Sequence, residues 1–211
     1  MLLMLIRHGA TGLTAKQLVG RTPGVHLSDT GKAQARRLVE RLEDIPIDQV
    51  YSSPMERATE TAVPLAEQRG LKVKTDARLN ECDYGQWTGQ DFKTLRKTEL
   101  WKRVQLRPAD ARFPGGEALR EVQARIVGCI DDLAEAHPKE TVAAFSHGDV
   151  IKAALAHYIG VHLDLFQRLH VAPAAVSALV LSASGPGLVC VNEVGGLAEL
   201  LPRRKGRAGQ N

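Results

Sequence analysis

The tripeptide Arg7-His8-Gly9 places a guanidinium and an imidazole side by side, directly after a short apolar run at residues 2–6. An aliphatic run of this length is typical of a buried strand, and Gly9 allows a sharp turn where the strand ends. Arginine offers a planar fork of donors to phosphate or carboxylate oxygens. A neutral histidine is a nucleophile or a base near pH 7. The pair therefore predicts phosphate chemistry through a histidine at the carboxyl end of a strand, where open α/β sheets bind ligands.

A second segment repeats this design near the other end of the chain. Residues 141–145 form another apolar run, and Ser146-His147-Gly148-Asp149 follows it, where an amphipathic helical pattern begins. His147 is thus expected between the end of a strand and the start of a helix. The backbone N–H groups at such a helix start, including that of Gly148, favour an anion.

A third strand is predicted at residues 48–52. Ser53, Pro54 and Glu56 follow it and are expected to act as N-cap, first helical residue and capping-box partner of the next helix. Arg57 then lies in the first helical turn, over the same edge of the sheet. If the three strands are parallel neighbours, Arg7, His8, Arg57 and His147 converge on one pocket.

The remaining elements are predicted from periodicity and turn signals. A loop at 9–27 contains Thr14 and Arg21, and residues 77–116 form a long excursion with a small helix near 91–103. The excursion lacks a core of its own, so it is the expected lid. The other predicted elements are a helix that carries Ala35, Leu38, Val39 and Leu42 at helical spacing, helices at 54–69, 117–136 and 149–159, strands at 72–74 and 168–171, and a closing hairpin at 175–181 and 188–191 joined by residues 185–187.

Several of these segments together resemble the histidine phosphatase superfamily, in its phosphoglycerate-mutase-like branch. The segments that carry the resemblance are residues 5–11, 27–35, 51–62, 79–89, 114–117 and 146–148, in family order along the chain. The resemblance implies a three-layer α/β/α sandwich with a mostly parallel central sheet. One such domain is expected over residues 1–200, with the lid-like excursion at about 77–116.

The resemblance also implies the mechanism and the residues that carry it. His8 is the expected nucleophile, which would become a phosphohistidine, while Arg7, Arg57 and His147 would bind the phosphoryl oxygens. Glu81 stands where the family's motif places an acid, which would protonate the leaving group and later activate water. Asp83 and Asp149 are weaker competitors for that role, and Asp149 is more simply read as a charge at its helix start.

Further residues are candidates for substrate binding. Thr14 stands where many family members have asparagine, so its hydroxyl is expected to reach the phosphate less far. Thr11 matches the family residue and is expected to orient the loop, while Arg21 and Lys16 could meet a second anionic group. Gly148 is expected to offer its backbone N–H. The remaining histidines show no spacing typical of metal ligands, so no metal and no cofactor are expected.

Composition places this chemistry in an ordinary globular chain. The chain has 211 residues and a net charge of +4, but four of its basic residues lie at 203–207. Without them the acidic and basic residues are equal in number, so the basic pI of 9.1 does not indicate a nucleic-acid surface. Residues 201–211 are expected to be a disordered basic tail. No stretch approaches a membrane span, and three scattered cysteines indicate reduced thiols in the cytoplasm.

Three functions are compatible with these observations. The favoured one is a phosphomonoesterase that acts on a small phosphorylated metabolite through a phosphohistidine. A cofactor-dependent phosphoglycerate mutase is the first alternative, although only 33 positions separate Glu81 from Pro114, and this short lid favours hydrolysis by water. The other alternative is a non-catalytic protein that binds a phosphorylated ligand, against which the pair of His8 and His147 argues. The expected partner is a small phosphate ester, with a homodimer possible and neither nucleic acid nor a membrane expected.

Overall fold

The computed structural model describes residues 1–14 and 16–195. The basic tail predicted at 201–211 lies outside the described residues. The helices and strands are β1 (Leu2–Arg7), α1 (Asp29–Arg41), β2 (Gln49–Ser52), α2 (Glu56–Gln68), β3 (Val73–Thr75), α3 (Phe92–Leu95), α4 (Glu99–Leu106), α5 (Leu119–Ala136), β4 (Thr141–Ser146), α6 (Gly148–Tyr158), β5 (Val176–Ser182) and β6 (Gly185–Glu193). Short 3-10 turns occur at Ala77–Leu79, Gly85–Trp87, Pro108–Asp110 and Leu163–Arg168.

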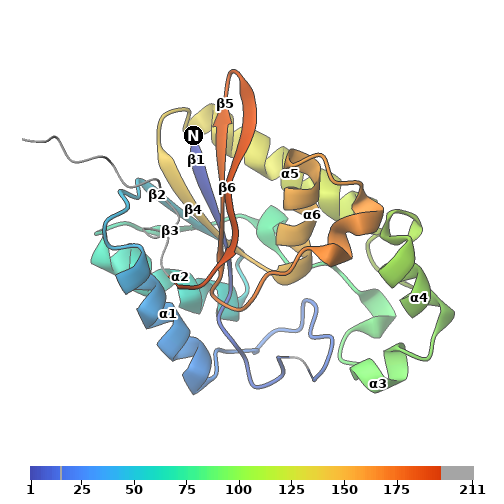
Figure 1. Cartoon of the computed structure of the whole chain (residues 1–211). Helices are drawn as coiled ribbons and strands as arrows, with labels where there is room; N and C mark the ends of the chain where they lie inside the picture. Colours follow the sequence, from blue (N-terminus) through green and yellow to red (C-terminus); the bar gives the residue numbers. More distant parts are fainter. Residues whose placement is uncertain (15, 196–211) are drawn as a thin grey trace, which may run out of the picture.

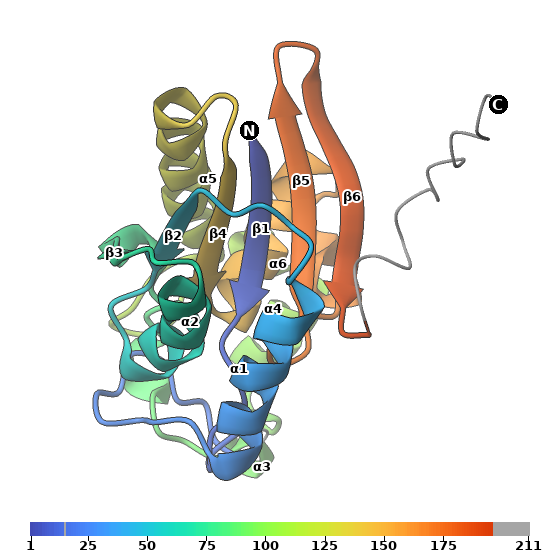
Figure 2. The same ribbon diagram turned by 90° about the vertical axis from the view of Figure 1, so that its left-hand side faces the viewer.

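The strands form one sheet with the order β3-β2-β4-β1-β5-β6. The first four are parallel, and β5 and β6 are antiparallel. Helices α1 and α2 cover one face of the sheet and α5 and α6 the other (Figures 1 and 2). The predicted three-layer sandwich with a mostly parallel sheet is therefore confirmed.

The alternation of side chains along the strands divides the core between these faces. In β1, Leu3 and Leu5 belong to the apolar cluster under α5 and α6, whereas Met4 and Ile6 belong to the cluster under α1 and α2. Successive strand residues point to opposite faces, and both faces of a sandwiched sheet are dry, so the strand reads as a continuous apolar run. The excursion at 77–116 places its buried side chains in the same cluster as α5 and α6.

The parallel register brings the functional strand ends together. Arg7 in β1 pairs with Ser146 in β4, and Ser52 in β2 pairs with Phe145 in β4. The residues that follow these strands therefore emerge at one edge of the sheet. The loop after β1 and helices α3 and α4 lie beyond this edge (Figure 1).

The loop after His8 approaches the start of α1 unusually closely. Ser28 is the N-cap of α1, and its hydroxyl accepts a hydrogen bond from Gly31 N at 3.1 Å and donates one to the Ala10 carbonyl at 3.0 Å. A Cβ atom at Gly31 would lie 2.0 Å from that same carbonyl oxygen. Only glycine permits this contact, which anchors the loop that directly follows the predicted nucleophile.

Three local predictions are wrong. Residues 168–171 are not a strand. A 3-10 turn ends at Arg168, and residues 169–171 have no regular secondary structure. Helix α2 begins at Glu56 with Met55 as its N-cap, and the Glu56 carboxylate accepts from Gly24 N rather than closing a capping box. Residues 185–187 belong to β6 instead of the hairpin turn, since Pro186 is tolerated on an edge strand.

Candidate active site

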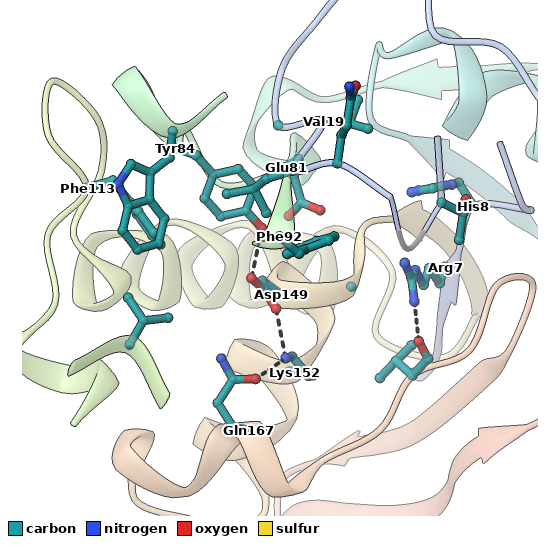
Figure 3. A pocket seen from close by; sticks show the side chains of 18 of the residues that line it. Arg7, His8, Val19, Glu81, Tyr84, Phe92, Phe113, Asp149, Lys152 and Gln167 are labelled. Atoms are coloured by element: carbon teal, nitrogen blue, oxygen red, sulfur yellow. Dashed lines mark hydrogen bonds and ion pairs between the residues drawn. The ribbon is translucent and has the colours of Figure 1, made fainter. Parts of the chain in front are cut away.

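A cavity of about 400 Å³ opens at the carboxyl ends of the parallel strands, a size suited to a small ligand. Its polar end contains Arg7, His8 and Arg57, and Glu81 lines the same cavity. Figure 3 shows Arg7 and His8 on one side, with Glu81, Tyr84, Asp149 and Lys152 facing them across the space. The structure thus brings Arg7, His8 and Arg57 together in one cavity.

His8 presents one free ring nitrogen to the cavity. Its Nδ1 lies 2.7 Å from the Gly9 carbonyl oxygen, which can only accept, so Nδ1 carries the proton. Burial, together with the Arg57 and Arg7 charges, lowers the pKa of His8 to about 3. The ring is therefore neutral near pH 7, and Nε2 keeps its lone pair. This is the protonation state that a nucleophilic histidine requires.

Arg7 and Arg57 each keep an unpartnered N–H group in the site. Arg7 Nη1 donates to the Val171 carbonyl at 2.6 Å, but its buried Nε has no partner. Arg57 is 2 % exposed and donates through Nη2 to the Gly20 carbonyl, whereas its Nη1 has no partner. A buried donor left unpaired costs free energy that a ligand can recover. The two groups are therefore well suited to a dianionic phosphoryl group.

His147 lies between β4 and α6, as the sequence predicted, but its side chain does not line the cavity. It is fully buried and is not among the residues that line the cavity, although its ring centroid lies 5.1 Å from that of His8. Its Nδ1 accepts from Arg57 Nη2 at 3.2 Å, and its Nε2 then donates to Ser53 Oγ at 2.9 Å. Ser53 in turn donates to Asn80 Oδ1. Because both ring nitrogens are occupied, the geometry favours a role in positioning Arg57 over direct contact with phosphoryl oxygens.

Glu81 has the environment expected of a general acid. Desolvation and the neighbouring Asp149 carboxylate raise the pKa of Glu81 to about 7. Burial alone would raise the pKa of Asp149 as well, but the Lys152 ammonium at 2.8 Å and the Tyr84 hydroxyl at 2.8 Å outweigh it and lower that pKa. Two adjacent carboxyl groups thus differ in protonation, which is the pattern that separates an acid from a stabilising charge.

Thr14 and Gly148 line the cavity, but Arg21 does not. The Thr14 hydroxyl accepts from Thr11 N at 2.8 Å, so it shapes the loop and can still donate its own hydrogen. A Cβ atom at Gly148 would sit 3.4 Å from Arg7 Nε, the nitrogen that has no partner. Arg21 instead donates to the Glu81 carbonyl at 2.8 Å and to the Glu117 carboxylate at 2.9 Å. The expectation that Arg21 meets the substrate is therefore corrected: it braces the segment that carries Glu81.

The sequence interpretation missed the side of the cavity opposite His8. Tyr84, Asp149, Lys152 and Gln167 form a hydrogen-bonded series there (Figure 3). An aromatic wall, defined as Tyr84, Trp87, Phe92, Trp101 and Phe113, lines the same space. The spacing of Asp149 and Lys152 on one helix face could have signalled the ion pair, but nothing in the spacing indicates their contacts with the excursion.

Two features are absent from residues 1–14 and 16–195. No helix in this part of the chain is long and apolar enough to cross a membrane. Within the same ranges, no group of three or more His, Cys, Asp or Glu side chains is placed to hold a metal ion.

The fold and the site together define a phosphoric monoester hydrolase. The chain belongs to the histidine phosphatase superfamily, branch 1, whose family model matches residues 3–194. Its family and fold thus agree with the resemblance seen in the sequence.

Named relatives include phosphatases and mutase-like proteins. The chain is 32% identical to phosphoserine phosphatase 1 of Hydrogenobacter thermophilus over 169 residues, and this aligned region covers 78% of this chain and 79% of the relative. It is 33% identical to phosphoglycerate mutase-like protein 4 of Arabidopsis thaliana, over 72% of this chain and 68% of the relative. A solved mycobacterial glucosyl-3-phosphoglycerate phosphatase, complexed with VO3, superposes with a TM-score of 0.82 at 27% identity, covering 90% of this chain and 98% of that one.

The unpaired guanidinium donors predict a measurable stabilisation by phosphate. A ligand that binds only the folded state at about 100 times its Kd adds about 2.7 kcal/mol, or a Tm rise of roughly 5–10 °C for a chain of this size. We expect inorganic phosphate to produce this shift in the wild-type protein and Arg57→Met to lose most of it. Thermal melts at constant ionic strength measure the effect, with Arg36→Met on the exposed face of α1 as the control. An equal shift in Arg57→Met would show that phosphate binds elsewhere.

Proposed function

We propose that the protein is a phosphomonoesterase in which His8 is the nucleophile and Glu81 is the general acid and base. The observation that carries the proposal is the neutral His8, with a free Nε2, beside two buried guanidinium groups that each hold an unpartnered N–H. A protein that only binds a phosphorylated ligand has no need of such a nucleophile.

The first step transfers the phosphoryl group to the enzyme. The Nε2 lone pair of His8 attacks phosphorus in line, and the bond between phosphorus and the ester oxygen breaks. The departing oxygen takes the proton of Glu81, so the product leaves as a neutral alcohol. Arg7 and Arg57 hold the equatorial oxygens while their charge redistributes. His147 and Ser53 fix Arg57 in the orientation this requires.

The second step regenerates the enzyme. The Glu81 carboxylate takes a proton from water, whose oxygen attacks phosphorus, and the phosphorus–nitrogen bond breaks. The electron pair returns to His8 Nε2, inorganic phosphate leaves and Glu81 is protonated again. The raised pKa of Glu81 suits both halves of this cycle, since a group that titrates near 7 can donate and accept at neutral pH.

The direct test is a screen of the purified protein against small phosphate esters, with released inorganic phosphate as the readout. Phosphoserine and phosphoglycerate belong in the panel because relatives are named for them. Hydrolysis should exceed transfer to 3-phosphoglycerate, which the short lid disfavours. Transfer that outpaced hydrolysis would instead identify a mutase.

The pH dependence of the first step separates His8 from Glu81. His8 is unprotonated above its pKa of about 3, so it does not limit the reaction at neutral pH. Glu81 donates only while it is protonated, so the phosphorylation rate on an alkyl phosphate should fall about tenfold per pH unit above about pH 7. Rapid-quench measurement of enzyme phosphorylation between pH 5 and 9 tests this. A rate that increased with pH over this range would exclude Glu81 as the acid.

Activity is expected to survive EDTA. The two guanidinium groups supply the positive charge that a metal would otherwise bring to the phosphoryl oxygens. Assays after dialysis against EDTA, with and without added Mg²⁺ or Zn²⁺, measure this. Loss of turnover that either metal restores would contradict the proposed mechanism.

We further propose that the protein works in the reducing cytoplasm. Its three cysteines, Cys82, Cys129 and Cys190, are buried free thiols. Light scattering of the purified protein will show whether it forms a homodimer.

A further inference from the structure

The cavity continues beyond the phosphate-binding end, so its other walls select the alcohol portion of the ester. Within the described residues that line it, the permanent cations are Arg7, Arg57 and Lys152. A phosphoryl dianion occupies the two arginines. The charge of Lys152 therefore decides whether the site can accept a second anionic group.

Lys152 is already paired with a carboxylate. Its ammonium lies 2.8 Å from Asp149 Oδ1 and donates to Gln167 Oε1 at 2.8 Å. It also stands 4.5 Å from the centroid of the Phe166 ring, and its side chain is only 13% exposed. An ammonium has three N–H donors, of which Asp149 and Gln167 take two, and the Phe166 ring lies beside the same ammonium. Among the described residues that line the cavity, a second carboxylate or phosphate on the substrate would find no unpaired permanent cation, and it would face the carboxyl groups of Glu81 and Asp149.

The remaining wall is apolar and aromatic. Both tryptophans and two of the four phenylalanines of the chain line this one cavity, together with Tyr84. The rings contact one another: Trp87 stacks on Trp101 at 6.4 Å, and Phe92 meets Trp101 edge-on at 6.0 Å. Trp87 and Phe113 are buried and serve the core as well, whereas Phe92 and Trp101 are only half-buried beside the cavity. These two side chains are therefore available to a ligand.

From this arrangement we infer that the substrate is a phosphate monoester of an uncharged alcohol that carries an apolar ring, which packs against Phe92 and Trp101. The inference rests on the proposed phosphomonoesterase activity. Aromatic side chains bind apolar ring faces by burying area and by favourable stacking. Esters with a second anionic group, including phosphoserine and phosphoglycerate, should be poor substrates, because an unpaired buried charge is costly.

The decisive experiment compares benzyl phosphate with 4-carboxybenzyl phosphate, which differ by one carboxylate. Both esters are assayed under the same conditions. We expect kcat/KM to be about 10²-fold lower for the carboxylated ester. Equal values, in an activity that His8→Ala removes, would overturn the inference and leave the phosphatase proposal intact. No phosphate release from either ester or from the wider panel would overturn both.

Two variants locate the ring contact. Phe92→Ala and Trp101→Ala should each lower the ratio of kcat/KM for benzyl phosphate to that for methyl phosphate about tenfold. Both kcat/KM values are measured on the same preparation of each variant, so a partly folded variant lowers both equally and leaves their ratio unchanged. The matched control is Leu106→Ala, because Leu106 lies on α4 with Trp101 but is 73% exposed. Unchanged ratios in both variants would show that the aromatic wall does not hold the alcohol.

A third variant tests the charge argument. Asp149→Asn removes the anion that neutralises Lys152, so the site gains a cation able to meet a carboxylate. The ratio of kcat/KM for 4-carboxybenzyl phosphate to that for benzyl phosphate should rise about tenfold, whatever the variant does to both rates in common. An unchanged ratio would overturn the assignment of Lys152 as the engaged cation that excludes anionic substrates.

Discussion

His8→Ala is expected to lose at least about 10⁴ in turnover, which is the order of loss when an enzyme's covalent nucleophile is removed. No other residue on the described cavity wall offers the combination of a neutral ring and a free nitrogen beside both unpaired guanidinium groups. Rapid quench with labelled substrate should trap a phosphoryl group on the wild-type protein that is labile in acid and stable in base. Peptide mapping should place it on His8.

The control for this prediction is His157→Ala. His157 lies on the exposed face of α6, so its removal should leave turnover unchanged. Circular dichroism and a thermal melt confirm that His8→Ala folds. Label recovered on a serine or a carboxylate, or turnover retained in folded His8→Ala, would refute the phosphohistidine intermediate.

Glu81→Gln should slow the hydrolysis of an alkyl phosphate by roughly 10²–10⁴-fold, the usual contribution of general acid–base catalysis. An alkoxide is a poor leaving group and needs the proton that Glu81 supplies. A nitrophenolate leaves almost unaided, so phosphorylation of His8 by para-nitrophenyl phosphate should slow much less. Stopped-flow release of nitrophenol measures that step, and a burst would show that dephosphorylation has become limiting.

Asp83→Asn is the matched control for Glu81→Gln. The Asp83 carboxylate accepts from Gly85 N at 2.9 Å and does not belong to the cavity lining, so its loss should affect both substrates little. Equal losses on the two substrates in Glu81→Gln, without a burst, would make Glu81 a binding or structural residue. Asp149 would then be the next acid to test.

The sequence predicted the part of the site that strand ends create. Arg7 and His8 follow the apolar run at 2–6 and Arg57 follows the strand predicted at 48–52, and parallel strands bring their carboxyl ends to one edge. Glu81 came from the family resemblance, since nothing local shows that the excursion folds back over this edge. The raised pKa of Glu81 depends on Asp149, 68 positions further along the chain, and no spacing rule connects the two.

The expectations that this geometry does not support concern side chains whose partners are distant in sequence. Arg21 was a candidate for meeting a second anionic group of the substrate, but its partner Glu117 lies 96 positions away. His147 was expected to contact phosphate, yet Arg57 and Ser53 occupy both of its ring nitrogens. The aromatic wall has the same origin: Trp87 and Trp101 lie on separate parts of the excursion and meet only when it folds.

The close approach of Gly31 to the Ala10 carbonyl creates a trade-off between the stability of α1 and the position of the loop beside the catalytic residue. Gly31 lies inside α1, where alanine would favour the helix by about 1 kcal/mol. An attempt to thermostabilise this enzyme by raising its helix propensity would therefore replace Gly31. A methyl group there would push the loop off the helix and carry His8 with it. The enzyme thus retains a weak point in α1 for the sake of the loop that follows His8, and adaptation to heat must be found at other positions.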